Sequence, residues 1–473
     1  MKLKNEEIEI KKLISNKEGY SEIQKYLNLN KEELKKFSDK FISKLKEYEE
    51  KNMFINKAKK DQIKKAIKDR KLIYSVKDNI CTSSIKTTAG SKILENYNPM
   101  FDAKVIDDIG GFVLGKTNMD EFGFGGFGIN SGYSTTKNAW NDDYTSGGSS
   151  SGSGVYSSIF PFFSIAESTG GSISSPAAFN GVIGFTPSYG MISRFGLISY
   201  ANSLDKIGFT GRYIKDIEAI FKLVTENKDD RDATNIVKNK EKDKIKKIAI
   251  IDELCDVEDD VLLNFKNTIN KIKGEDYQFE KISVPLLKYS VSAYYILSTA
   301  EASTNLNKYC GLRFGKMGNW MKNYNEYFKE IRTKYLGEEA KRRIILGTFT
   351  RMQGYKDKYY EKAQKIRKKM ILEFKEIFEE YDAFINPTMP INVPKIKEIN
   401  KLTPKETYKM DMCTVPSNLM GLPHISLPSS NHSKGKMPKG IQITTKRYND
   451  FSLLDFAKDY EKKFKPKFKE VWF

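Results

Sequence analysis

The sequence predicts an α/β fold in which helices cover a large mixed β-sheet. Short apolar segments typical of buried strands recur along the chain, and longer segments with helical periodicity lie between them. The chain has 473 residues and is 39% hydrophobic, so it can bury a large core. Helices that alternate with short buried strands indicate layers of helices on a sheet.

The first part of the chain is predicted to be helical. Within residues 30–48, Asn30 is placed to cap a helix, and apolar residues follow at intervals of three and four. These residues are Leu34, Phe37, Phe41, Leu45 and Tyr48. They form one stripe that can pack on the rest of the protein. We therefore expect an N-terminal helical segment (1–70) packed on the core of a main domain (71–473).

Strand candidates and helical stretches then alternate. The segment GFVLG is followed by KTNMDEF, in which Thr117 or Asn118 is expected to start a helix. A long helical pattern covers 325–380, and the polar stretch 226–247 is interpreted as a surface loop. The strand candidates are LIYSV (72–76), GFVLG (111–115), IAII (248–251) and AFINP (383–387).

Composition limits the classes of function. The net charge is +19, but the lysines are spread along the chain with acids between them, which favours biased composition over a dedicated nucleic-acid site. We find no secretory signal and no apolar run of the roughly 20 residues that a membrane span needs. The four cysteines lie far apart, which indicates reduced thiols. We expect a cytoplasmic protein without a membrane partner.

Two glycine-rich stretches resemble nucleotide-binding motifs without meeting their requirements. GFGGFG at 123–128 follows a stretch with helical character, whereas a dinucleotide fingerprint follows a strand. GGSSSGSG at 147–154 lacks the Lys-Ser or Lys-Thr of a phosphate loop. His424 and His432 are the only histidines, so we expect no histidine-rich metal site.

Serines, glycines and one lysine instead suggest a nucleophilic site. Lys77 follows a buried strand, Ser149 lies in SGGSS, and Ser172 lies in TGGS. A serine hydroxyl needs a base, and a lysine whose pKa is lowered by burial can act as one where histidine is scarce. Glycines beside a serine leave backbone N–H groups free to face an oxyanion. Taken singly, a Gly-Gly-Ser is usually a turn and a lysine is usually solvated.

Together these residues resemble the amidase signature family, whose hydrolases use a Ser–cis-Ser–Lys triad. The similarity runs from about residue 70 to the C-terminus, and its most specific part is the stretch 169–211. It implies an α/β/α sandwich around a large mixed sheet. The matching segments are YSVKDNI, GKTNMDEFG, SGGSSSGSG, the stretch that begins STGGSISSPAAFNG, and NPTMP.

The resemblance assigns roles to residues. It implies that Lys77 is the base, that Ser149 follows a cis peptide bond and relays the proton, and that Ser172 is the nucleophile. It implies an oxyanion hole made by the backbone of Thr169, Gly170 and Gly171.

Further segments are similar to the glutamine-hydrolysing subunits of tRNA-dependent amidotransferases. They include STAEASTNL, AKRRIILGTF and TVPSNLMGLPHISLP. This similarity implies that glutamine is held by Arg343, Asp411 and a tyrosine, which local context assigns to Tyr294, although the adjacent Tyr295 is also possible. Arg343 can pair with the substrate carboxylate, and Asp411 can accept from its ammonium group.

The resemblance also implies a role in a complex. We expect glutamine to be hydrolysed to glutamate, and the ammonia to reach a partner that amidates Glu-tRNA(Gln) or Asp-tRNA(Asn). ATP and Mg²⁺ are expected at the partner, with no cofactor or metal in this chain, in a heterotrimer with the B and C subunits of the amidotransferase. The alternatives are a stand-alone amidase for a small or acyl amide and a scaffold without activity, which the intact triad disfavours.

The sequence departs from the family pattern at three positions near the expected triad. Ser168 stands where an acid is usual, Ser174 where a basic residue is usual, and Ser151 where a glycine is common. These departures leave the triad residues intact and place the hydrogen bonding around them in question.

Overall fold

The computed structural model describes residues 20–237, 243–274, 276–319, 323–399, 401–430, 437–464 and 467–473. These residues contain one sheet of eleven strands in the order β1-β3-β2-β4-β6-β5-β10-β11-β9-β7-β8. The sheet is mixed, because β2 pairs in parallel with β3 and β4, whereas β4, β5 and β10 have antiparallel partners. His432 lies outside the described residues.

The strands are short. Their bounds are Phe54–Lys57 (β1), Ile73–Lys77 (β2), Phe112–Thr117 (β3), Ser164–Ser168 (β4), Ile183–Thr186 (β5), Lys206–Gly211 (β6), Lys247–Ile251 (β7), Gln278–Ile282 (β8), Ala383–Pro387 (β9), His424–Pro428 (β10) and Gly440–Thr445 (β11). The four segments predicted as strands are β2, β3, β7 and β9, so the apolar runs identified them correctly.

The helices differ widely in length. Their bounds are Glu22–Asn28 (α2), Lys31–Glu47 (α3), Lys60–Lys68 (α4), Lys104–Ile109 (α5), Ser151–Ile159 (α6), Ser174–Asn180 (α7), Ile214–Val224 (α8), Asp259–Ile272 (α9), Ser290–Asn305 (α10), Tyr324–Tyr335 (α11), Glu338–Arg351 (α12), Lys362–Glu380 (α13), Ile396–Ile399 (α14), Pro404–Lys409 (α15), Val415–Leu419 (α16) and Asp450–Lys463 (α17). The helical pattern over 325–380 is divided among α11, α12 and α13.

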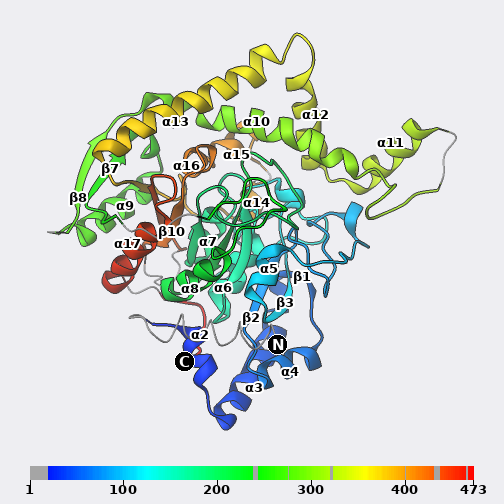
Figure 1. Ribbon diagram of the computed structural model, residues 1–473, viewed down its shortest axis with the longest axis vertical. Helices are drawn as coiled ribbons and strands as arrows, with labels where there is room; N and C mark the ends of the chain where they lie inside the picture. Colours follow the sequence, from blue (N-terminus) through cyan, green and yellow to red (C-terminus); the bar gives the residue numbers. More distant parts are fainter. Residues whose placement is uncertain are drawn as a thin grey trace.

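Helices cover both faces of the sheet. On β6 the Thr210 hydroxyl donates to the Ser153 carbonyl of α6, whereas Gly211 faces Ile217 of α8. Adjacent residues of a strand point to opposite faces, so α6 and α8 lie on different sides. Figure 1 shows α10, α12 and α13 arching over one end of the sheet, with α2, α3 and α4 at the other end. The predicted α/β/α architecture is therefore observed.

The stripe on α3 forms as predicted. Asn30 caps the helix, with its side chain accepting from the amides of Glu32 and Glu33. Phe41 is fully buried, and its ring centroid lies 5.1 Å from that of Phe160 and 5.7 Å from that of Trp472. The stripe thus joins α3 to the end of α6 and to the C-terminal segment.

Replacing Phe41 by alanine is expected to lower the free energy of unfolding by about 3–5 kcal/mol, because a large buried side chain leaves a cavity among neighbouring rings. Equilibrium unfolding in urea measures this change. Lys36→Ala on the exposed face of α3 is the control, and its effect should stay within about 0.5 kcal/mol. Equal losses in both variants would contradict the packing role of Phe41.

The helix expected to start at Thr117 or Asn118 does not form. Thr117 ends β3, and only a short 3₁₀ turn (Glu121–Gly123) follows. The Asn118 side chain donates to the carbonyls of Asn52 and Ser134 and accepts from Met119. These contacts tie loops together and occupy the groups that a helix cap would use, so this prediction was wrong.

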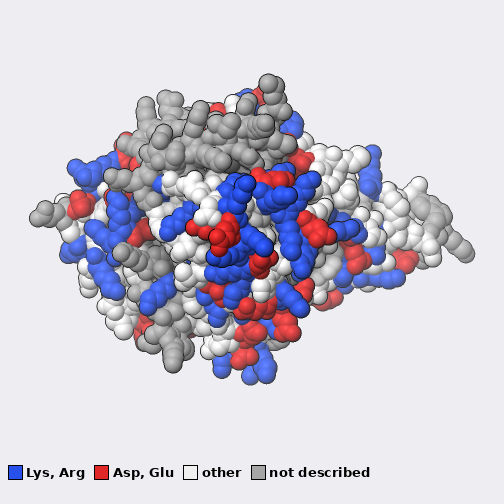
Figure 2. Space-filling model, turned by 90° about the horizontal axis from the view of Figure 1, so that it is seen from below, with Lys and Arg blue, Asp and Glu red and all other residues white. Residues whose placement is uncertain are grey.

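Charges of both signs share the surface. On the face seen in Figure 2, Lys and Arg side chains are interspersed with Asp and Glu. This view agrees with the interpretation of the +19 net charge as a matter of composition. None of the described helices combines the length and apolar character needed to cross a bilayer. The four cysteines are unpaired.

Candidate active site

Lys77 is the last residue of β2, and its ammonium group is buried. Nζ lies 2.8 Å from Ser149 Oγ, 2.9 Å from the Glu167 carbonyl oxygen and 2.9 Å from Glu167 Oε2. Burial lowers the pKa of Lys77 from its usual value, and the Glu167 carboxylate acts in the opposite direction. The end of β2 therefore places the desolvated amine of Lys77 within hydrogen-bond distance of the Ser149 hydroxyl.

The Gly148–Ser149 peptide bond is cis, and it lies near the end of the long segment that joins β3 to α6. A side chain at Gly148 would clash with the Asp120 carboxylate, 2.1 Å from an ideal Cβ, and with the Gly128 amide nitrogen at 2.6 Å. The Ser149 carbonyl accepts from the Asp120 amide at 3.1 Å. Glycine is thus required here by the close approach of neighbouring groups, and the approach fixes Ser149 beside Lys77.

Ser172 lies in the turn between β4 and α7 and is 6% exposed. Its carbonyl accepts from the Ser150 amide at 3.2 Å, which joins this turn to the loop that carries Ser149. The structure therefore brings Lys77, at the end of β2, together with the loops that carry Ser149 and Ser172, and Ser172 is itself largely buried.

The backbone before Ser172 is tightly packed on its other side. An ideal Cβ at Gly170 would lie 2.9 Å from the Tyr294 hydroxyl, and one at Gly171 would lie 2.4 Å from Thr414 Oγ1. In the described part of the chain, the amides of Gly170 and Gly171 donate to no other group. Free N–H groups beside a nucleophile are suited to binding an oxyanion.

The site contains two further carboxylates that the sequence analysis missed. Glu167 Oε2 accepts from Asn79 at 3.0 Å as well as from Lys77, and Thr169 Oγ1 lies 2.8 Å from Glu167 Oε1. The same hydroxyl lies 2.9 Å from Asp205 Oδ1. The only sequence signal for Glu167 is an acid two residues before TGGS, and Asp205 has none from spacing.

The residues expected to hold the substrate form one cluster beside Gly170. Arg343 of α12 is 3% exposed; its Nη1 donates to Tyr200 at 2.7 Å and its Nε to Glu339 at 2.8 Å. The Tyr295 hydroxyl donates to Asp411 at 2.5 Å. Both neighbouring tyrosines lie in this cluster: Tyr294 packs on Gly170, and the Tyr295 hydroxyl donates to Asp411. Tyr200 was not predicted from the sequence.

The three unusual serines have different surroundings. The Ser168 hydroxyl donates to the Gly170 carbonyl at 3.0 Å, and the Ser151 hydroxyl reaches the Asn118 carbonyl at 3.2 Å. The Ser174 hydroxyl is buried and has no hydrogen-bond partner among the described residues. The first two serines thus hydrogen-bond to neighbouring backbone, whereas the Ser174 hydroxyl makes no such contact in the described part of the chain.

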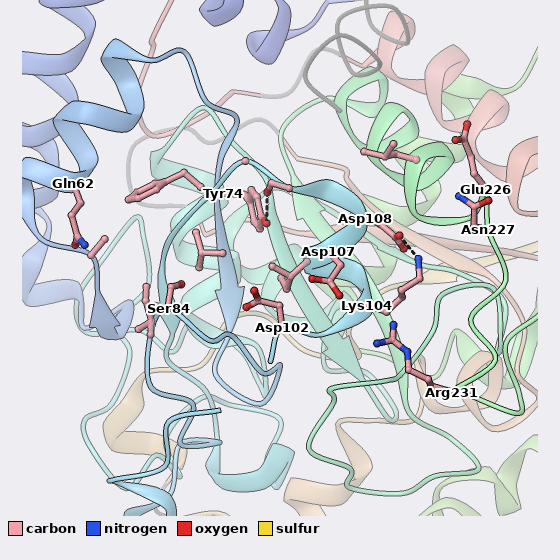
Figure 3. Close-up of a pocket in the computed structure, with 18 residues that line it drawn as sticks. Gln62, Tyr74, Ser84, Asp102, Lys104, Asp107, Asp108, Glu226, Asn227 and Arg231 are labelled. Atoms are coloured by element: carbon pink, nitrogen blue, oxygen red, sulfur yellow. Dashed lines mark hydrogen bonds and ion pairs between the residues drawn. The ribbon is translucent and has the colours of Figure 1, made fainter. Parts of the chain in front are cut away.

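A large surface cavity of about 840 Å³ lies elsewhere, beside β2, β3 and α5. Figure 3 shows Tyr74, Asp102, Lys104 and Arg231 among the residues around it. None of the expected site residues lines this cavity. Within the described residues no group of histidine, cysteine and carboxylate side chains is arranged to hold a metal ion.

A profile of the Amidase family matches residues 39–454. The chain belongs to this family. The A subunit of glutamyl-tRNA(Gln) amidotransferase from Archaeoglobus fulgidus is 41% identical over 391 residues, which cover 81% of this chain and 84% of that protein. Its counterpart from Saccharolobus solfataricus is 36% identical over 460 residues, or 93% of each chain. Within the amidase family, the chain therefore belongs with these amidotransferase proteins.

Solved structures agree with this assignment. The crystal structure of the corresponding glutamyl-tRNA(Gln) amidotransferase protein from Thermotoga maritima aligns with a TM-score of 0.76 at 31% identity, and the alignment covers 93% of this chain and 94% of that one. Allophanate hydrolase of Kluyveromyces lactis aligns with a TM-score of 0.78 at 22% identity, over 94% of this chain and 72% of that one. The second similarity concerns the amidase fold alone.

Proposed function

We propose that the chain is the glutaminase component of a tRNA-dependent amidotransferase. It hydrolyses glutamine to glutamate and supplies ammonia for the conversion of Glu-tRNA(Gln) to Gln-tRNA(Gln), or of Asp-tRNA(Asn) to Asn-tRNA(Asn). The observation that carries the proposal is the buried contact of 2.8 Å between Lys77 and Ser149, in a loop bonded to the Ser172 turn. The names of the relatives support the choice of substrate.

In the proposed reaction Ser172 attacks the side-chain amide carbon of glutamine. Ser149 takes the hydroxyl proton of Ser172 and passes its own proton to the neutral amine of Lys77. The N–H groups of Gly170 and Gly171, with the adjoining backbone of Thr169, stabilise the oxyanion. The proton returns through Ser149 to the amide nitrogen, ammonia leaves, and water hydrolyses the glutamyl ester on Ser172.

The cluster beside Gly170 suits an amino acid. Nε and Nη1 of Arg343 hold protein groups, and Nη2 has no hydrogen-bond acceptor among the described residues. Nη2 can therefore donate to the substrate carboxylate. Asp411 can accept from the substrate ammonium group, with Tyr294 and Tyr295 forming the wall between these groups and the nucleophile.

Like the amidotransferase proteins that it resembles, the chain is one component of a multi-subunit enzyme. We propose that the B and C subunits complete a heterotrimer, that the partner binds ATP and Mg²⁺, and that charged tRNA binds through the complex. A partner surface is supported by the outer side of α12, where Ile345, Leu346 and Phe349 are exposed, and by the exposed Met352 directly after the helix. Adjacent exposed apolar side chains of this kind usually mark protein interfaces.

Release of glutamate and ammonia from glutamine tests the proposal. We expect glutamate release by the chain with its partner subunits to rise when ATP and charged tRNA are added, and free ammonia to fall short of glutamate because the amidation then consumes it. Ser172→Ala in the same complex gives the background. A rate of glutamine hydrolysis that does not change when the partner subunits are added would instead identify a stand-alone amidase. Hydrolysis of other amides but not of glutamine would identify one as well. No hydrolysis by any combination would favour the scaffold interpretation.

A further inference from the structure

The hydrogen bonds of Lys77 use all the donors of an ammonium group. Nζ has three acceptors within 2.9 Å: Ser149 Oγ, the Glu167 carbonyl and Glu167 Oε2. A neutral amine keeps only two hydrogens and one lone pair. The carbonyl and an ionised carboxylate can only accept. When Lys77 loses a proton, its two hydrogens therefore stay on Glu167, and its lone pair is left facing the Ser149 hydroxyl.

The Glu167 side chain is held firmly in this position. It is 1% exposed, Asn79 donates to the oxygen that meets Lys77, and Thr169 contacts the other oxygen. The Thr169 hydroxyl has one hydrogen but lies between two carboxyl oxygens, one of Glu167 and one of Asp205. One of the two carboxyl groups must therefore donate a hydrogen itself.

Asp205 is the group suited to carry this extra proton. Burial and the neighbouring Glu167 charge raise the pKa of Asp205 well above its usual value. With the extra proton on Asp205, Asp205 can donate to Thr169 Oγ1 and the Thr169 hydroxyl can donate to Glu167, so both Glu167 oxygens act as acceptors, from Thr169 on one side and from Lys77 and Asn79 on the other. Asp120, in the loop after β3, is the other carboxyl that acts on Lys77 from nearby, and burial raises its pKa to about 6.

We propose that Glu167 is a positioning residue for the base, which orients the lone pair of Lys77 toward Ser149 and sets the pH at which Lys77 becomes neutral. This inference rests on the proposed roles of Lys77, Ser149 and Ser172. It adds a residue to that machinery, because the base then works as a Lys77–Glu167 pair. The adjacent Ser168 cannot replace Glu167, since its hydroxyl is directed to the Gly170 carbonyl.

Two variants separate the effect of the Glu167 charge on the protonation of Lys77 from the effect of Glu167 on the orientation of the Lys77 amine. Glu167→Gln keeps an oxygen acceptor but removes the negative charge that favours protonated Lys77. Activity rises as pH rises through the pKa of Lys77, so the half-maximal point should move to lower pH, by about 1–3 units. Glu167→Met removes the acceptor as well. It should show the same movement, and its maximal rate should also fall about tenfold or more.

Two readouts are measured across pH on the full-length chain. One is glutamine hydrolysis in the presence of the partner subunits, and the other is the rate at which a fluorophosphonate probe labels Ser172. Labelling needs an activated serine but no glutamine. Glu218→Gln is the matched control, because Glu218 is also 1% exposed and pairs with lysines, Lys222 and Lys458, in a different part of the fold. Its profile should coincide with that of the wild type.

The outcomes separate this inference from the proposed function. Movement of both profiles in the two Glu167 variants supports the pair. Movement of the labelling profile without any glutamine hydrolysis supports the pair and overturns the glutaminase assignment. Unmoved profiles in variants that only lose activity or stability would overturn the inference and leave Glu167 a packing residue. A wild-type chain that is neither labelled nor active would overturn both.

Discussion

Replacing Ser172 by alanine is expected to lower kcat for glutamine hydrolysis by about 10⁴–10⁶-fold, because the variant has no nucleophile to form the ester. Lys77→Met should lose a similar amount, since an unactivated hydroxyl attacks an amide very slowly. Groups that act as one unit are not additive, so the double variant should be about as slow as either single variant. Stopped assays of glutamate release measure the three rates.

Ser174→Ala is the matched control for this prediction. Ser174 lies two residues after the nucleophile, and its buried hydroxyl has no hydrogen-bond partner among the described residues. Removing such a hydroxyl costs little, so we expect activity within about twofold of the wild type and a free energy of unfolding that is unchanged or slightly higher. Calorimetric titration with glutamine should also show that Ser172→Ala still binds substrate. Normal turnover by Ser172→Ala would exclude the proposed nucleophile.

The sequence alone predicted those helices and strands whose pattern lies in neighbouring residues. Four apolar runs identified β2, β3, β7 and β9, and an Asn followed by spaced apolar residues identified α3. The helix expected after β3 failed because Asn118 makes its hydrogen bonds to distant loops. Cap chemistry is visible in a sequence, but the loops that compete for the same side chain are not.

In the candidate site, too, residues within a recognisable motif were predicted, whereas residues placed there only by the fold were not. The family motifs suggested Lys77, Ser149 and Ser172, and their loops meet in the structure. Glu167 was missed because an acid beside a strand end has no periodicity that distinguishes it from a surface residue. Asp205 was missed because only the fold brings it to the Thr169 hydroxyl. Interactions of buried charges depend on tertiary placement, so the protonation of this site required the structure.

Replacing Arg343 by lysine is expected to lower kcat/KM for glutamine by about 30- to 1000-fold, mainly through KM. Arg343 is buried, and its guanidinium group can hold Glu339, Tyr200 and a carboxylate together because its donors diverge in one plane. An ammonium group cannot keep all three contacts, and losing a buried charged contact costs about 2–4 kcal/mol. Steady-state kinetics with glutamine and with butanamide, which has no α-carboxylate, measure the effect.

The comparison between the two amides decides what Arg343 does. A residue that binds the α-carboxylate should affect glutamine strongly and butanamide by less than about threefold. Arg342→Lys is the matched control, because Arg342 precedes Arg343 on α12 and also pairs with Glu339 but is about half exposed. An equal loss with both substrates would mean that Arg343 only supports Tyr200 and Glu339. The cluster would then lack a group for the α-carboxylate, and a stand-alone amidase would become the better account of this site.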